Sequence, residues 1–305
     1  MPLVVVTTSP RVAPGVLSHQ AWRALASGRV LTASEDHPQL PYLAEAGIEV
    51  EVVVPDHAAL VRQAVDDTVV WLATEDEHFM RAVGHAALAL DEPPVIEVVP
   101  GSYDLPGARV LDLVAVMDRL RAECPWDRKQ THATLVPYLI EEAYEVQESV
   151  ERGDYAELRE ELGDVLLQVA FHSRVAEGFD IDDVADAIVT KLVRRHPHVF
   201  GSVIVENADE VNANWEAIKA TEREGKDLFD GVPMGQPALS LAAQLIRRAE
   251  GVGAPESLAH AVGQGVAREL FDLVRRAQQA GLDAEAELRA AARTYRDRVE
   301  AWESR

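Results

Sequence analysis

Hydrophobic residues in the first hundred positions fall into short runs that alternate with amphipathic stretches. The runs read as strands and are LVVV from Leu3, VL from Val30, IEVEVVV from Ile48, TVVWLAT from Thr68 and PVIEVV from Pro94. The stretches between them, around 19–26, near 43, from 57 and from 75, read as helices. Strands that alternate with helices indicate a largely parallel sheet with helices packed on it. We therefore predict a small α/β domain over residues 1–105.

After a turn-rich segment at 100–107, the pattern is helical almost to the last residue. The predicted helices cover 110–122, two arms of a hairpin within 135–171, 182–195, 209–224, 238–249 and 265–302. Thr131 and Asp154 are placed to cap the two hairpin helices, which are separated at Gly153. A glycine- and proline-rich stretch, GKDLFDGVPMGQP, follows residue 224. We predict a mainly α chain, with an all-α helical bundle over 106–230 and a further helical segment over 231–305.

The hairpin within 135–171 carries two groups of acids. Residues three and four apart share a helix face, so Glu141, Glu142 and Glu145 point roughly one way. Glu161 and Asp164 do the same on the second helix. The apolar residues around them predict a buried face and are Leu139, Ile140, Val146, Leu158, Leu162, Leu166, Leu167 and Val169. We therefore expect the acids at the edge of a seam between two helices.

Carboxylates on facing helices repel one another and need compensation. Two like charges about 4 Å apart cost on the order of 4 kcal/mol at an effective dielectric of ~20. Raised pKa values, Arg or Lys partners, or bound cations would each relieve this cost. Oxygen ligands without His or Cys favour a hard ion, and Mg²⁺ fits best, with Mn²⁺ able to substitute. The alternative is a solvated acidic surface, which the second acidic group on the partner helix disfavours.

The composition narrows the classes of function. The chain has 305 residues and a formal charge of -23, with 52 acidic and 29 basic residues. Sequence-independent binding of nucleic acid needs a basic footprint and is disfavoured. The single cysteine, Cys124, supports neither a disulfide framework nor a cysteine metal site. No apolar stretch approaches about 18 residues and the first residues do not resemble a signal peptide, so we expect a soluble cytoplasmic protein with no membrane partner.

The sequence EEAYE at 141–145, followed by ELGD at 161–164, resembles the MazG family of all-α nucleoside triphosphate pyrophosphohydrolases. The family signature is EExxE, a spacer and ExxD. Flanking segments match in order and are MDRLRAECPWDRKQTH, EELGDVLLQVAFHSRVAE, KLVRRHPHVF and NWEAIK. The resemblance implies Mg-dependent hydrolysis of NTPs or dNTPs between the α and β phosphates, which gives NMP and pyrophosphate. It also implies a house-cleaning role in the nucleotide pool. It also implies a MazG-like helical bundle and a homodimer.

The resemblance also implies roles for individual residues. The implied metal ligands are Glu142, Glu145, Glu161 and Asp164. Glu141 would complete the catalytic acids by orienting the attacking water or by holding an additional ion. Lys191 and Arg195, four apart on one helix, are implied phosphate contacts, and a solvated basic face is the alternative.

Aromatic residues complete the implied substrate site. Trp215 is an implied platform for the base and Lys219 a further phosphate contact, with core packing as the alternative for Trp215. Trp126 and His132 are placed to approach the base, although Trp126 could instead anchor a Pro-Trp turn. An indole stacks on any base, so the preference for base and sugar stays open.

Two further resemblances concern the ends of the chain. The segment from 171 resembles the segment from 273, with Gly178 and Asp180 matched by Gly281 and Asp283. In that register the second copy lacks the acids, so 231–305 reads as a degenerate, structural MazG-like segment. The stretch SPRVAPGVLSHQAWRAL resembles the opening of the tetrapyrrole-methylase fold, which makes 1–105 a degenerate remnant of that fold.

Two other functions are kept as alternatives. A non-catalytic nucleotide-binding sensor or scaffold would use the same acids without turnover. A di-iron carboxylate protein needs Glu-x-x-His pairs on two helices, and the only such spacing we find is Glu75 with His78.

Overall fold

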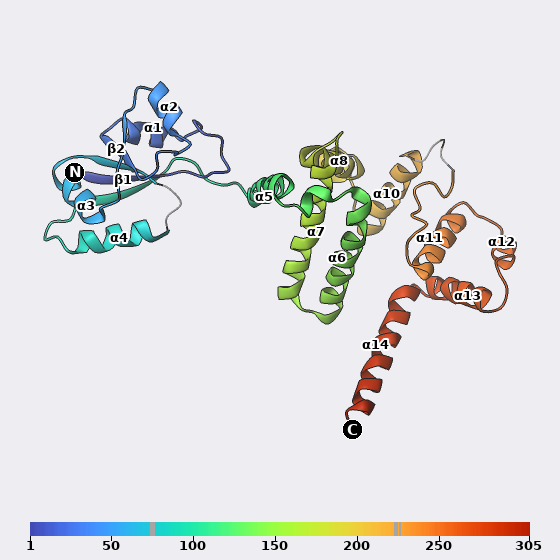
Figure 1. Cartoon of the computed structure of the whole chain (residues 1–305). Coiled ribbons are helices and arrows are strands. Elements are labelled where there is room, and N and C mark those ends of the chain that lie inside the picture. Colours follow the sequence, from blue (N-terminus) through green and yellow to red (C-terminus); the bar gives the residue numbers. More distant parts are fainter. Residues whose placement is uncertain (74–76, 223–224, 226) are drawn as a thin grey trace. The chain divides into compact units, whose positions relative to one another are not determined.

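The computed structural model describes residues 1–73, 77–222, 225 and 227–305 of the chain. The chain divides into two compact units, Met1–Ile188 and Val189–Arg305. The first unit contains a parallel sheet and a helical hairpin, and the described part of the second is helical (Figure 1). The prediction of a mainly α chain with a small α/β part at its beginning is confirmed. Glu75, which the di-iron alternative requires, lies outside the described residues.

Five parallel strands form the sheet, in the order β3-β2-β4-β1-β5. The strands are β1 Pro2–Thr7, β2 Arg29–Thr32, β3 Val50–Val52, β4 Val69–Leu72 and β5 Val95–Pro100. The helices that connect them are α1 His19–Leu25, α2 Leu40–Glu45, α3 His57–Asp66 and α4 Glu77–Leu88. Parallel strands require such crossovers because each strand must begin at the same end of the sheet.

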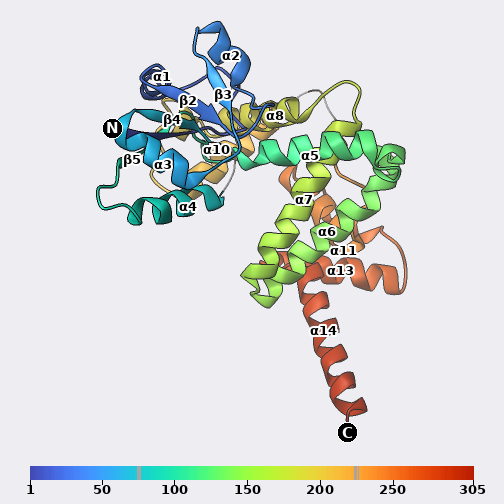
Figure 2. The ribbon, with the colours of Figure 1, turned by 60° about the vertical axis from the view of Figure 1, so that its left-hand side comes forward.

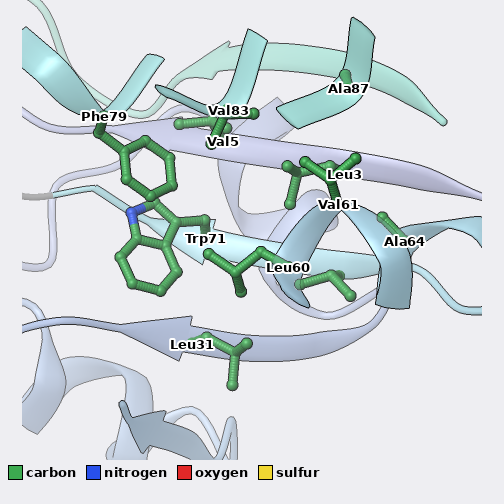
Figure 3. Close-up of a cluster of buried hydrophobic side chains, with 11 residues drawn as sticks. Leu3, Val5, Leu31, Leu60, Val61, Ala64, Trp71, Phe79, Val83 and Ala87 are labelled. Atoms are coloured by element: carbon green, nitrogen blue, oxygen red, sulfur yellow. The ribbon is translucent and has the colours of Figure 1, made fainter. Parts of the chain in front are cut away.

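Both faces of the sheet are covered, which explains why its strands read as continuous apolar runs. Helices α3 and α4 cover the face that carries Leu3 and Trp71. Helices α1 and α2 cover the opposite face, which carries Val4 and Val70. Figure 3 shows the first cluster, in which the ring of Phe79 stacks on the Trp71 indole with 4.8 Å between ring centres. The largest core of the chain therefore belongs to this sheet.

The rest of the first unit is helical. Its elements are α5 Arg109–Glu123, the 3₁₀ turn η1 Asp127–Lys129, α6 His132–Arg152, α7 Tyr155–Val175 and the start of α8 Ile181–Arg195. Helices α6 and α7 lie side by side as a hairpin (Figures 1 and 2). Helix α5 packs on α7, and Met117, Leu135 and Phe171 form a small core there. This core fixes the hairpin end that is remote from its turn.

The ends of the hairpin helices follow from local capping. Thr131 begins α6 with a capping box, in which its side chain and that of Thr134 each accept a hydrogen bond from the other's backbone N–H. Gly153 ends α6 in the left-handed region at φ 72°, which glycine adopts without a Cβ penalty. The Asp154 carboxylate accepts hydrogen bonds from the N–H groups of Ala156 and Glu157 and begins α7. Both predicted caps are confirmed.

Gly153→Ala should lower the free energy of unfolding by about 1 kcal/mol, because an alanine Cβ is strained at this positive φ. Gly163→Ala, in the interior of α7, should raise it by roughly 0.5–1 kcal/mol, since a Cβ there meets no atom within 4 Å. Urea unfolding of the two metal-free variants measures both changes. If both substitutions changed the free energy of unfolding in the same direction, the left-handed conformation assigned to Gly153 would be contradicted.

The second unit contains the remaining helices. They are α9 Pro197–Phe200, α10 Ala208–Glu222, α11 Ala238–Gly251, α12 Glu256–His260, α13 Val266–Gln279 and α14 Ala284–Glu303. The prediction of one helix over 265–302 is wrong, because Gly281 at φ 73° ends the first stretch and Asp283 caps the second. Asp180 accepts the same kind of hydrogen bonds at the start of α8. This local likeness agrees with the internal repeat, which stays a prediction.

Across the described residues, no helix is both long enough and apolar enough to cross a membrane.

Candidate metal centre

Three carboxylates from the two hairpin helices converge at one point. Glu142 and Glu145 lie on α6 and Glu161 lies on α7, and each offers an oxygen within 4.8 Å of the others' oxygens. The two α6 residues are three positions apart and so share a face. The structure thus brings three of the five predicted acids together across the hairpin.

Burial and mutual repulsion within the cluster favour the protonated forms of its acids. The pKa of Glu142 is raised from its ordinary 4.5 to about 7, first by burial, then by a hydrogen bond with Glu145 and by the charges of Asp164, Glu145 and Glu141. Burial and the charges of Glu145, Asp164 and Glu157 also raise the pKa of Glu161. Raised pKa values were one of the three forms of compensation expected from the sequence.

Asp164 and Glu141 lie beside this point rather than in it. Neither belongs to the group whose oxygens fall within 4.8 Å of one another. Both nevertheless act on Glu142 through their charges, so they lie within electrostatic reach. Glu160, the neighbour of Glu161, is exposed and pairs with Arg159 at 3.8 Å. It therefore points away from the cluster, as its position on the helix predicts.

The donor set fits a hard divalent cation. All three converging groups are carboxylates, and such oxygen ligands suit Mg²⁺ or Mn²⁺. Across the described residues, no lysine or arginine forms an ion pair with Glu142, Glu145 or Glu161. Of the three forms of compensation, the described residues therefore supply raised pKa values and no ion pair.

The apolar residues beside the acids are not buried in the single chain. Ile140 is 49% exposed and Leu162 is 52% exposed, and Leu166 is exposed as well. The expectation of a buried face around the acids is therefore wrong for these residues. Two helices alone cannot cover them, because the α6–α7 seam buries only one stripe of each helix.

Trp126 lies in the turn between α5 and α6, against the rings of Tyr138 and Phe171. Its indole is 50% exposed, so it combines packing with an open face. Tyr138 precedes Glu142 by four residues on α6 and so shares its face. These contacts suit a packing anchor and leave room for a ligand contact.

The remaining predicted substrate residues belong to the second unit. The Lys219 ammonium lies 3.8 Å from the centre of the Trp215 ring, and the Arg195 guanidinium carbon lies 6.0 Å from it. Arg195 also bonds to Glu222, and this partner is the main reason why the pKa of Glu222 falls to about 2. Lys191 is exposed. The structure thus brings Arg195, Trp215 and Lys219 together.

The structure also shows a pair that the sequence did not reveal. His132 at the start of α6 and His172 near the end of α7 lie with their Nδ1 atoms 2.8 Å apart and their rings nearly parallel. Burial and the neighbouring His132 lower the pKa of His172. The two residues are 40 positions apart, so no local pattern could have joined them.

Comparison with known proteins gives the relatives of this chain. Residues 130–200 match the model of the MazG nucleotide pyrophosphohydrolase domain. A nucleoside triphosphate pyrophosphohydrolase of Mycolicibacterium smegmatis is 40% identical over 265 residues, which cover 82% of this chain and 75% of the relative. The enzyme of the same name from Escherichia coli K12 is 43% identical over 180 residues, covering 56% and 68%.

A further relative has no activity in its name. An uncharacterized 26.1 kDa protein of Streptomyces cacaoi is 52% identical over 219 residues, which cover 69% of this chain and 89% of that protein. The residues matched by the domain model include all five predicted catalytic acids, and exclude Trp126, Trp215 and Lys219.

Proposed function

The chain belongs to the MazG family of nucleotide pyrophosphohydrolases, and from this premise we propose that it hydrolyses nucleoside triphosphates to NMP and pyrophosphate. The bond cleaved is the one between the α and β phosphates, for NTPs or dNTPs, in the service of nucleotide-pool house-cleaning. The observation that carries the proposal is the convergence of Glu142, Glu145 and Glu161 within the residues that match the family.

The metal site that we propose consists of Glu142, Glu145, Glu161 and Asp164, with Mg²⁺ as the ion and Mn²⁺ as a substitute. When bound, the ion would neutralise triphosphate charge and lower the pKa of water. Glu142 must lose its proton to act as a ligand at neutral pH, because its pKa is near 7 in the ion-free protein. Glu141 lies beside the cluster and is assigned to orient the attacking water or hold an additional ion.

The cationic and aromatic residues are assigned to the substrate. Lys191, Arg195 and Lys219 would receive phosphate oxygens, whose charge a guanidinium or ammonium stabilises. Trp215 would stack on the base, and its ring already attracts two cations in the second unit. Trp126, whose indole is half exposed, is assigned as a further contact of the base.

Product analysis tests the reaction class. The full-length protein with Mg²⁺ is incubated with a panel of NTPs and dNTPs, and the products are separated by ion-exchange chromatography. We expect NMP and pyrophosphate in equal amounts. Orthophosphate with NDP would contradict the proposed bond, and saturable binding without any product would favour a nucleotide sensor or scaffold instead.

We further propose a homodimer that covers the exposed apolar residues of the hairpin. Ile140 and Leu162 flank the acids and remain about half exposed in the single chain. Light scattering should give twice the 33.4 kDa of one chain. Leu162→Glu should give a monomer, and Leu88→Glu, at an exposed position on α4, should leave the dimer intact. A wild-type monomer would overturn this part of the proposal.

A further inference from the structure

A cavity of about 240 Å³ lies in the N-terminal part of the first unit, away from the acidic cluster in sequence. It is bounded by the residues that follow β1, β2 and β4, at the carboxyl edge of the sheet. The lining residues that bear on a ligand are Thr8, Pro10, Pro14, His37, Pro38 and Gln39. Nothing in the proposed hydrolysis uses any of them.

The topology makes this edge the expected position of a ligand. Adjacent strands β2 and β4 send their connections in opposite directions, because β2 continues through α2 to β3 at one edge of the sheet and β4 continues through α4 to β5 at the other. Loops that part in this way leave a crevice above the carboxyl ends of the strands, and open α/β sheets bind ligands there. His37 and Ala73, which follow β2 and β4, both line the cavity.

The walls of the cavity are held by hydrogen bonds between its loops. The Gly15 N–H donates to the Gln39 side-chain carbonyl at 2.8 Å, which joins the loop after β1 to the loop after β2. The His37 Nε2–H donates to the Ala73 carbonyl at 3.3 Å, and its Nδ1 accepts from the Gln39 N–H at 3.2 Å. Both nitrogens of His37 are therefore occupied in its neutral form. Such a preformed cavity orders few side chains when a ligand binds.

One lining residue, Gln39, carries a side-chain amide nitrogen that the described part of the fold does not use. Gln39 is only 2% exposed, and its side-chain carbonyl is used by Gly15. Its amide nitrogen donates no hydrogen bond to any described residue, which leaves two N–H donors at the cavity wall. The Thr8 hydroxyl also has no partner within the described chain. These donors are available to a ligand or water that occupies the cavity.

The chemistry of the lining selects the ligand. No lysine or arginine is among the described residues that line the cavity, so an anionic group would find no counter-charge. Three prolines and the His37 ring present flat apolar faces, which suit a flat molecule. The side-chain amide of glutamine matches the hydrogen-bonding edge of a nitrogen heterocycle. The volume lies below that of pockets for drug-sized ligands, which begin at about 300 Å³.

We propose that this cavity binds an uncharged nitrogen heterocycle of nucleobase size, free or as its nucleoside, with the Gln39 amide on its acceptor edge. The site is separate from the metal centre and takes its ligand without phosphate and without metal. It would therefore bind in the presence of a chelator, and it would discriminate against the phosphorylated forms of the same heterocycle.

Titration calorimetry of the full-length protein in EDTA tests the proposal with adenine, uracil, adenosine, uridine and the two 5′-monophosphates as probes. We expect saturable binding of at least one base or nucleoside, and binding of its monophosphate at least tenfold weaker. Gln39→Leu should weaken binding at least tenfold, and Thr8→Val, which disturbs no hydrogen bond of the fold, should weaken it several-fold.

Ser27→Ala is the matched control, because this exposed hydroxyl bonds only to the Ala24 carbonyl and does not line the cavity. It should leave binding unchanged. Absence of saturation by every uncharged probe would overturn the proposal, and so would monophosphates that bind as tightly as nucleosides. An unchanged dissociation constant in Thr8→Val would overturn the assignment of the ligand to this cavity.

Discussion

Glu161→Gln should lower the rate of pyrophosphate release at least about 100-fold, equivalent to about 2.7 kcal/mol of transition-state stabilisation. Glu161 is the one α7 residue whose carboxylate converges with two carboxylates of α6. Glutamine keeps its size and removes its charge, so the loss would reflect ligand chemistry rather than packing. Asp164→Asn should act in the same direction. The measurement is the initial rate of pyrophosphate formation at saturating Mg²⁺ and nucleotide.

Glu160→Gln is the control for this experiment. Glu160 adjoins Glu161 in sequence but is exposed and pairs with Arg159. The same substitution one residue away should therefore leave the rate within about twofold. Circular dichroism and thermal melting of both variants establish that each is folded. An unchanged rate in a folded Glu161→Gln protein would show that the acidic cluster takes no part in the reaction.

Glu142→Gln should stabilise the metal-free protein at pH 8 and have little effect at pH 5. The folded-state pKa of Glu142 is about 7 and its ordinary value is 4.5, so the folded protein binds more protons than the unfolded chain between these values. Its contribution to the free energy of unfolding therefore falls as the pH rises from 4.5 through 7. Because glutamine cannot ionise, the variant does not undergo this pH-dependent fall in the free energy of unfolding. Thermal melting in EDTA at the two pH values measures the difference.

Mg²⁺ should reverse the order of stability of the wild-type protein and the Glu142→Gln variant. An ion that binds only the folded state adds about 2.7 kcal/mol at a concentration 100 times its Kd. The wild-type protein should gain this stabilisation at pH 8, and Glu142→Gln should gain much less. Glu148→Gln, at an exposed position on the same helix, is the control and should behave as the wild type. A metal-free Glu142→Gln protein less stable than the wild type at pH 8 would contradict the assigned repulsion.

Local rules made the hairpin predictable from the sequence. Thr131, Gly153 and Asp154 each act within three or four residues of their own position, so their capping roles could be assigned without a structure. Helical spacing placed Glu142 and Glu145 on one face, and a short connection placed Glu161 opposite them. The distant pair of His132 and His172 follows from no such rule, because it depends on how α6 and α7 pack.

The sequence misled about the apolar residues beside the acids. Ile140 and Leu162 have the spacing of core residues, yet both are about half exposed. A hydrophobic pattern states that a face needs a partner, and it does not state whether the partner belongs to the same molecule. Gly281 was missed for a different reason. The apolar period on both sides of it is strong, and a single glycine in the left-handed region sufficed to divide the helix.

The two-residue turn at Gly153 and Asp154 also limits how this chain can change in length. Eight positions separate Glu145 from Gly153, and seven separate Asp154 from Glu161. One residue inserted between Asp154 and Glu161 would rotate Glu161 by about 100° around its helix axis, away from the acids of α6. The turn therefore sets the register between the two helices, because each acid lies a fixed number of helical residues from it. Along these two arms the chain can exchange many side chains, but an insertion or deletion of a single residue separates the acids.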